Sequence, residues 1–228
     1  MPTDNDPIAK YLDCLHDLPR TLEESYEKLV RLGPLPIDGY YITALILRTV
    51  KTYYEGQNQT INFLNKRQRG ATADFFVETF LFYLKAFIQT HNLPVVVLSE
   101  ANIKRQRGSL RPDISVWQGD ELVATIECKT NLGFNRHGWE EQFSERESRI
   151  HRDYFPNARC FLVVLTAVNW PGFKESSKIG DQYFTLSKAW PPHIDLDHIE
   201  DYIANPIEPL FGQIETLVRL APNQGFLR

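Results

Sequence analysis

The sequence is poor in the features that mark secreted and membrane proteins. It has only three cysteines, Cys14, Cys128 and Cys160, which are far apart and form no CxxC pair. Neither a disulfide framework nor a zinc knuckle is therefore expected. It has no run of 18 uncharged apolar residues, and residues 1–13 hold no basic segment followed by an apolar one. We expect a cytoplasmic protein without a membrane-spanning segment.

An excess of positive charge and the common cofactor motifs are also absent. The formal net charge is −4, which argues against a protein whose whole surface binds nucleic acid. The sequence holds no GxGxxG, no Walker phosphate loop, no HExxH and no GxSxG, so the chemistries of those motifs have no support. Any contact with nucleic acid must come from local basic patches.

The apolar pattern is helical at the two ends of the chain and strand-like in its centre. Residues 7–68 show helical spacing, and residues 75–88 are apolar on nearly every side, which predicts a buried helix that Asp74 can cap. The later elements are expected as strands at 95–98, 112–117 and 122–129, a charged helix at 138–154, strands at 161–165 and 183–186, and a closing helix at 206–220.

The central elements therefore follow the order α-β-β-β-α-β, which indicates an α/β fold. The length fits a single domain over residues 1–228. Within it we expect a helical extension at 1–71, a core at 72–166 and a C-terminal elaboration at 167–228.

The hairpin connected through residues 118–121 concentrates acidic side chains on one face. Side chains alternate between the two faces of a strand. The apolar face is expected to hold Ile114, Val116, Leu122, Ala124, Ile126 and Cys128. The other face then holds Asp113, Ser115, Thr125, Glu127 and Lys129. A three-residue turn at 119–121, or a bulge, would set Asp113 opposite Glu127.

Two carboxylates that close together need a cation or a proton between them. Mg²⁺ accepts one or two carboxylates with oxygen from water, backbone and phosphate, and the backbone carbonyl of Cys128 is a candidate further ligand. Such a metal lowers the pKa of bound water and neutralises charge on a phosphodiester. Lys129 could orient that water, take its proton or stabilise transition-state charge. The pattern indicates metal-assisted phosphodiester hydrolysis, and a solvated hairpin face is the competing interpretation.

The segments Arg111-Pro112-Asp113 and Ile126-Glu127-Cys128-Lys129 resemble the PD-(D/E)XK nuclease superfamily, the fold of many type II restriction endonucleases. The resemblance covers residues 72–166. It implies a restriction-endonuclease-like core with a mixed central sheet flanked by helices. It also implies Mg²⁺-dependent cleavage of double-stranded DNA, in which Mn²⁺ can substitute, with Asp113 and Glu127 as metal ligands and Lys129 as the catalytic lysine.

Two further positions match the family only in part. Many members carry a glutamate on the first core helix, and Glu78 occupies a matching place; a glutamate facing solvent or an arginine is the alternative. Some branches use a glutamine on the second helix, and Gln142 is a candidate match, although exposed helical glutamines are ordinary. The resemblance also implies a homodimer and leaves open a cognate DNA methyltransferase as partner.

Basic and polar loops around the hairpin are the candidate DNA-binding segments. Lys66–Gly70 and Lys104–Gly108 are identical five-residue stretches. Candidate contacts to phosphates or guanine edges are Lys104, Arg105, Arg107, Arg111, Asn135, Arg136 and Gln142. Loops 99–111, 131–138 and 169–181 compete as the recognition loop.

We therefore expect a metal-dependent DNA endonuclease of the type II restriction class. Two alternatives stay open. The first is a DNA repair or recombination nuclease that recognises structure, and the second is a nuclease-like module that binds nucleic acid without cutting. The intact acidic residues and Lys129 count against the second alternative.

Overall fold

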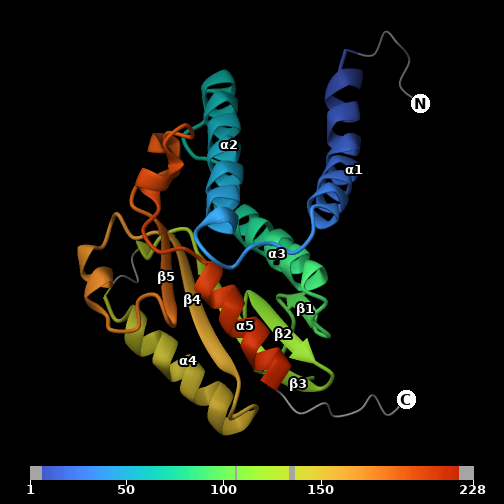
Figure 1. The fold of residues 1–228 in the computed structure, drawn as a ribbon. Helices are drawn as coiled ribbons and strands as arrows, with labels where there is room; N and C mark the ends of the chain where they lie inside the picture. Colours follow the sequence, from blue (N-terminus) through green and yellow to red (C-terminus); the bar gives the residue numbers. More distant parts are fainter. Residues whose placement is uncertain (1–6, 106, 134–136, 221–228) are drawn as a thin grey trace.

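The computed structural model describes residues 7–105, 107–133 and 137–220, which form an α/β fold around one five-stranded mixed sheet (Figure 1). The strands are β1 (Val96–Ser99), β2 (Ile114–Gln118), β3 (Glu121–Lys129), β4 (Arg159–Thr166) and β5 (Tyr183–Ser187), and they lie in this order across the sheet. β2 runs antiparallel to both β1 and β3, whereas β4 runs parallel to both β3 and β5.

Helices cover both faces of this sheet. The α-helices are α1 (Ala9–Arg31), α2 (Tyr41–Leu64), α3 (Thr72–Thr90), α4 (Trp139–Asp153) and α5 (Glu208–Leu220). Short 3-10 helices lie at Pro171–Glu175, Pro191–His193 and Ile199–Tyr202. The expected α-β-β-β-α-β order is present from α3 to β4.

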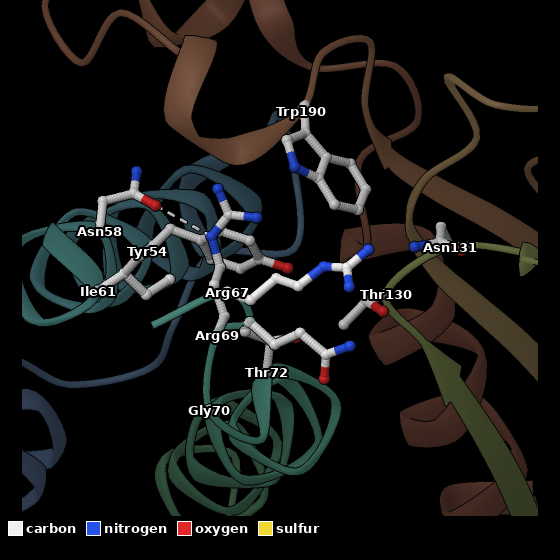
Figure 2. Close-up of a pocket in the computed structure, with 11 residues that line it drawn as sticks. Tyr54, Asn58, Ile61, Arg67, Arg69, Gly70, Thr72, Thr130, Asn131 and Trp190 are labelled. Atoms are coloured by element: carbon white, nitrogen blue, oxygen red, sulfur yellow. Dashed lines mark hydrogen bonds between the residues drawn. The ribbon is translucent and has the colours of Figure 1, made fainter. Parts of the chain in front are cut away.

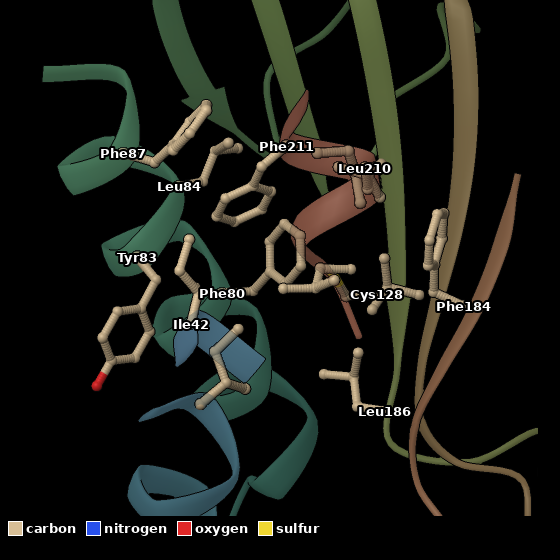
Figure 3. Packing of buried hydrophobic residues seen from close by; sticks show 14 of the residues in the cluster. Ile42, Phe80, Tyr83, Leu84, Phe87, Cys128, Phe184, Leu186, Leu210 and Phe211 are labelled. Atoms are coloured by element: carbon tan, nitrogen blue, oxygen red, sulfur yellow. The ribbon is translucent and has the colours of Figure 1, made fainter. Parts of the chain in front are cut away.

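Two apolar clusters hold the layers together. The larger one joins α2, α3 and α5 to one face of the sheet, where the rings of Phe80 and Phe211 meet edge-on and Cys128 and Phe184 of the strands belong to the same cluster (Figure 3). The smaller cluster joins α4 to the other face, with Phe143 packed edge-on against Tyr183. Because successive β3 side chains alternate, Ile126 and Cys128 enter the first cluster and Glu127 between them faces α4.

Of the two N-terminal helices, α1 lies outside this layered core, whereas α2 contributes buried side chains to it. α1 and α2 both project beyond the sheet (Figure 1). α1 has no buried residue, and its exposed apolar side chains include Tyr11, Leu15, Leu18 and Leu22, spaced by three and four positions on one side of the helix. None of the helices in the described part of the chain combines the length and apolarity needed to cross a bilayer.

α3 is the buried helix that the sequence predicts, but its start differs from the prediction. The helix begins at Thr72 with Ala71 as its N-cap residue, and no side chain caps it. Asp74 lies inside the first turn, where its charge still favours the positive end of the helix dipole. The prediction of Asp74 as the cap is therefore wrong, because the helix begins three residues earlier, at Thr72, than the apolar pattern shows.

The hairpin reaches the predicted register through a bulge. Ile114 pairs with Ile126 and Val116 with Ala124, but Trp117 pairs with Leu122, so Val123 is an extra residue on β3. The bulge reverses the alternation toward the turn. Leu122 consequently lies in the α4 cluster, not on the apolar face predicted for it. Only the half of the hairpin on the side of the bulge away from the turn keeps the predicted faces.

α5 is joined to the start of α2 through a buried polar network. The Glu208 carboxylate accepts hydrogen bonds from the backbone N–H of Thr43 at 3.0 Å and from its hydroxyl at 2.6 Å. The Thr43 hydroxyl oxygen accepts from the backbone N–H of Ile207 at 2.7 Å. Both Thr43 and Glu208 are fully buried. Glu208 thus satisfies an N–H of the first turn of α2, which has no partner inside the helix.

Candidate active site

Two acids and a lysine of the hairpin meet at one end of the sheet, on the face covered by α4. Asp113 directly precedes β2, and Glu127 and Lys129 end β3. The Lys129 ammonium lies 3.1 Å from Asp113 Oδ2 and 3.3 Å from Glu127 Oε2. The backbone N–H of Cys128 donates to Asp113 Oδ2 at 2.8 Å. The predicted convergence of these three side chains is therefore present.

α4 adds a second cation and a polar wall to this group. Arg146 Nη1 lies 2.5 Å from Glu127 Oε1. Gln142, one turn earlier on the same side of α4, lines a cavity of about 390 Å³ together with Glu127, Lys129 and Arg146. The structure thus places Gln142 beside the hairpin residues, as the family resemblance implies. It also adds Arg146, which we did not predict.

At Glu127 and Lys129, the acidic and the basic side chain at the end of β3, burial and neighbouring charges of opposite sign shift the pKa in opposite directions. Burial raises the pKa of the Glu127 carboxyl and Asp113 raises it further, whereas Arg146 and Lys129 lower it, and the net shift is upward. Burial lowers the pKa of the Lys129 ammonium, but Glu127 and Asp113 raise it by more, so its net shift is also upward. Lys129 is a cation at neutral pH. Of its three predicted roles, orienting a group or stabilising negative charge is favoured over accepting a proton.

The residues present fit a hard divalent cation. Carboxylate oxygens are the donors that Mg²⁺ prefers, and the two carboxylates share one cation, the Lys129 ammonium. The Glu127 side chain is 7% exposed and that of Asp113 is 25% exposed. A metal ion or phosphate can therefore reach Asp113 from solvent while Glu127 forms the inner wall.

Cys128 contributes to this site through its backbone alone. Its side chain is buried in the larger apolar cluster, on the face opposite Glu127. Burial raises the pKa of its thiol well above the ordinary value, so the sulfur stays protonated. The prediction that Cys128 lies on the apolar face is confirmed, and only the backbone carbonyl is available as a metal ligand.

Glu78 does not join the candidate active site. It lies on the exposed side of α3 and lines a groove of about 620 Å³ with Leu22 and Tyr26 of α1. Phe76 and Phe80 face the sheet instead, and the helical rotation of 100° per residue turns Glu78 away from them. The prediction that Glu78 belongs to the catalytic group is therefore wrong in its geometry.

The predicted DNA-binding residues are spread over several places. Lys104, Arg105, Arg107 and Arg111 lie on the exposed loop between β1 and β2. Lys104 is directed to the far end of α4, where it lies 5.0 Å from the Tyr154 ring centre and donates to the Asp153 carbonyl. Asn135 and Arg136 lie outside the described residues.

A second group with metal-ligating side chains lies elsewhere on α4 and β4. Ligand atoms of Glu147, His151 and Cys160 lie within 4.8 Å of one another. Two of these side chains already have hydrogen-bond partners: the Glu147 carboxylate accepts from the Gln182 amide at 2.5 Å, and His151 Nε2 bonds the Ala158 carbonyl. Burial raises the pKa of the Cys160 thiol to about 11. All three cysteines are free. The imidazole of His151 and the thiol of Cys160 are softer donors than Mg²⁺ prefers, so this group is a poor match for the predicted metal.

Comparison of the chain with protein-family models, with curated proteins and with solved structures gives no significant match. Function therefore has to be inferred from the geometry of the site.

Proposed function

We propose that the protein is a metal-dependent endonuclease that hydrolyses DNA phosphodiester bonds, and that it belongs to the type II restriction class. One observation carries this proposal: Lys129 lies within 3.3 Å of both Asp113 and Glu127 on one face of a hairpin. A parallel strand and a helix that carries Gln142 follow in the order of the PD-(D/E)XK core. A solvated hairpin face is a poor alternative, because the Glu127 side chain is 7% exposed.

In this mechanism Asp113 and Glu127 would hold Mg²⁺, or Mn²⁺ in its place, and the Cys128 carbonyl would be available as a further ligand. The bound metal would supply a water of lowered pKa and compensation for charge that develops on the phosphate. Lys129, a cation beside both carboxylates, orients the attacking water or stabilises the pentacovalent phosphate. Arg146 lowers the pKa of Glu127 and so favours its ionised form, and Gln142 lines the same cavity.

Double-stranded DNA is the proposed substrate, with the loop of Lys104, Arg105, Arg107 and Arg111 as a contact surface. We propose a homodimer, because cleavage of both strands at a symmetric site calls for two active sites. The exposed apolar side of α1, which includes Leu15 and Leu18, supports association of this kind. A cognate DNA methyltransferase would be the expected partner if the enzyme protects a host genome.

Incubation with unmethylated plasmid and Mg²⁺ tests the proposal directly. Discrete fragments with constant end sequences are expected from a type II restriction enzyme. Nicking confined to branched or flapped DNA would instead assign the protein to repair or recombination. Retarded but uncut DNA at every divalent metal tested, with a protein that unfolds cooperatively, would contradict an enzymatic role.

Arg146→Ala is expected to slow cleavage and to move the acidic limb of the pH–rate profile to higher pH. Arg146 lowers the pKa of Glu127, and Glu127 must be ionised to bind a metal, so its loss shifts the required deprotonation upward. Arg146→Lys keeps the charge and should retain a profile closer to that of the wild type.

Single-turnover cleavage rates across the acidic and neutral range measure this shift. Arg152→Ala is the matched control, since Arg152 is exposed at the end of α4 and pairs with Asp153. An unchanged acidic limb in Arg146→Ala would show that Arg146 does not tune Glu127.

A further inference from the structure

A second cavity, of about 460 Å³, lies next to the candidate active site (Figure 2). It is formed by α2, the loop from α2 to α3, the chain just after β3, and Trp190. The residues that line it are Tyr54, Asn58, Ile61, Arg67, Gln68, Arg69, Gly70, Thr72, Thr130, Asn131 and Trp190. None of these residues is acidic, although the chain as a whole carries a net charge of −4.

The two arginines of this cavity differ in how they are held. Arg69 Nε donates to Asn58 Oδ1 at 3.0 Å, and its guanidinium lies 5.4 Å from the ring centre of Tyr54. Arg67 is exposed, and its side chain extends across the cavity toward Thr130 and Asn131 (Figure 2). Arg69 therefore has partners within the protein, whereas the guanidinium of Arg67 is directed at the space that a ligand would fill.

The start of α3 adds to the positive character of the cavity. Gly70 and Thr72 line it, and α3 begins at Thr72 with no side-chain cap. The first N–H groups of a helix lack partners inside the helix and carry the positive end of its dipole. Together with Arg67 they favour an anion such as a phosphate group.

An aromatic surface lies on the other side of the same space. Trp190 is partly exposed and stands over the cavity (Figure 2), while the buried Tyr54 meets it edge-on at a ring separation of 6.0 Å. The contact with Tyr54 fixes the orientation of the indole. A partly exposed, fixed indole beside a cationic side chain is the arrangement on which nucleic-acid bases stack.

The cavity shares one lining residue with the cavity at the candidate active site. Asn131 lines both cavities, and it is only two positions after Lys129. Two residues span at most about 7 Å of backbone. A DNA strand with its scissile phosphate at Asp113 and Glu127 would therefore bring a neighbouring nucleotide to Arg67 and Trp190.

We infer that this cavity binds one deoxynucleotide of the cleaved strand next to the scissile phosphate. Its phosphate lies against Arg67 and the start of α3, and its base stacks on Trp190, unstacked from the duplex. This inference rests on the proposed nuclease function, because it takes the occupant to be a DNA strand that also enters the active site.

The test measures binding in EDTA, so that it does not depend on cleavage. Fluorescence anisotropy compares a labelled oligothymidylate with an abasic oligonucleotide of the same length. Wild type is expected to bind the first about tenfold more tightly, because base stacking on an aromatic side chain is sequence-tolerant and strong. Trp190→Ala should remove this preference, and Trp190→Phe should keep most of it.

Arg67→Ala tests the phosphate contact independently of the base, and because Arg67 is exposed the substitution should leave the fold intact. It should weaken binding of both oligonucleotides and lower the slope of log Kd against log salt concentration by about one. Arg20→Ala, exposed on α1, is the control of equal charge change and should alter neither quantity. Thermal unfolding of each variant verifies that the fold is intact.

The outcomes separate this inference from the proposed function. Equal affinity of wild type for the two oligonucleotides, or unchanged binding by both Trp190→Ala and Arg67→Ala, would overturn the inference even if the protein cuts plasmid. Displacement of the oligonucleotide by free thymidine monophosphate at comparable concentration would also overturn it, since the cavity would then be a mononucleotide site. Loss of the preference in Trp190→Ala supports it, even where no cleavage is detected.

Discussion

Glu127→Gln is expected to abolish metal-dependent DNA cleavage while leaving the fold and DNA binding intact. Glutamine keeps the size of the side chain and can still accept a hydrogen bond from Arg146, but it removes the charge that would hold a divalent ion. A metal centre supplies several kcal/mol of transition-state stabilisation, so a loss of about 10³-fold or more in single-turnover rate is expected. Quantified conversion of supercoiled plasmid with Mg²⁺ measures this loss.

Asp113→Asn and Lys129→Ala should produce losses of the same kind, because the three side chains act as one group. Glu121→Gln is the matched control. It makes the same chemical change on the same strand, at the exposed end far from the site, and should cut at the wild-type rate. Near wild-type cutting by Glu127→Gln or Asp113→Asn would remove the proposed metal site.

Glu208→Ala is expected to lower the free energy of unfolding by about 3 kcal/mol. The substitution leaves the Thr43 N–H and hydroxyl without their buried acceptor and opens a void between α2 and α5. A buried hydrogen bond contributes about 0.5–1.5 kcal/mol, and a buried group left unsatisfied costs about 1–3 kcal/mol. For a chain of this length the melting temperature should fall by roughly 10 °C.

Calorimetry or denaturant unfolding measures this effect, with Glu200→Ala as the control for an exposed glutamate. Thr43→Ala and the double variant complete a thermodynamic cycle. Because Thr43 and Glu208 bond one another directly, the double variant should be much less destabilised than the sum of the two single variants. Additive losses would show that the network does not act as a unit.

The acidic face of the hairpin could be predicted because it follows from a local rule. Side-chain alternation alone places Asp113, Glu127 and Lys129 on one face, and the requirement for an apolar partner face fixes the register. The connection between the two strands could not be predicted in the same way. Whether the register arises from a longer turn or from a bulge depends on Val123 being accommodated as an extra residue, and the sequence pattern leaves both solutions open. Leu122 was consequently assigned to the wrong face.

Contributions from helices were harder to predict because they depend on how each helix is rotated against the sheet. Glu78 lies within an apolar run, but α1 covers part of that side of α3, so the exposed glutamate fits a groove away from the site. Arg146 could have been found, since it is four positions after Gln142 and therefore on the same side of α4. The cavity at Arg67 and Trp190 joins segments more than 100 residues apart, a contact that no local pattern indicates.

Anomalous diffraction from crystals of the wild-type protein soaked in Mn²⁺ tests the central claim most directly. The account predicts a peak bound by carboxylate oxygens of both Asp113 and Glu127, lost in crystals of Glu127→Gln grown and soaked in the same way. A well-occupied peak at Glu147, His151 and Cys160 with none at the hairpin would contradict it.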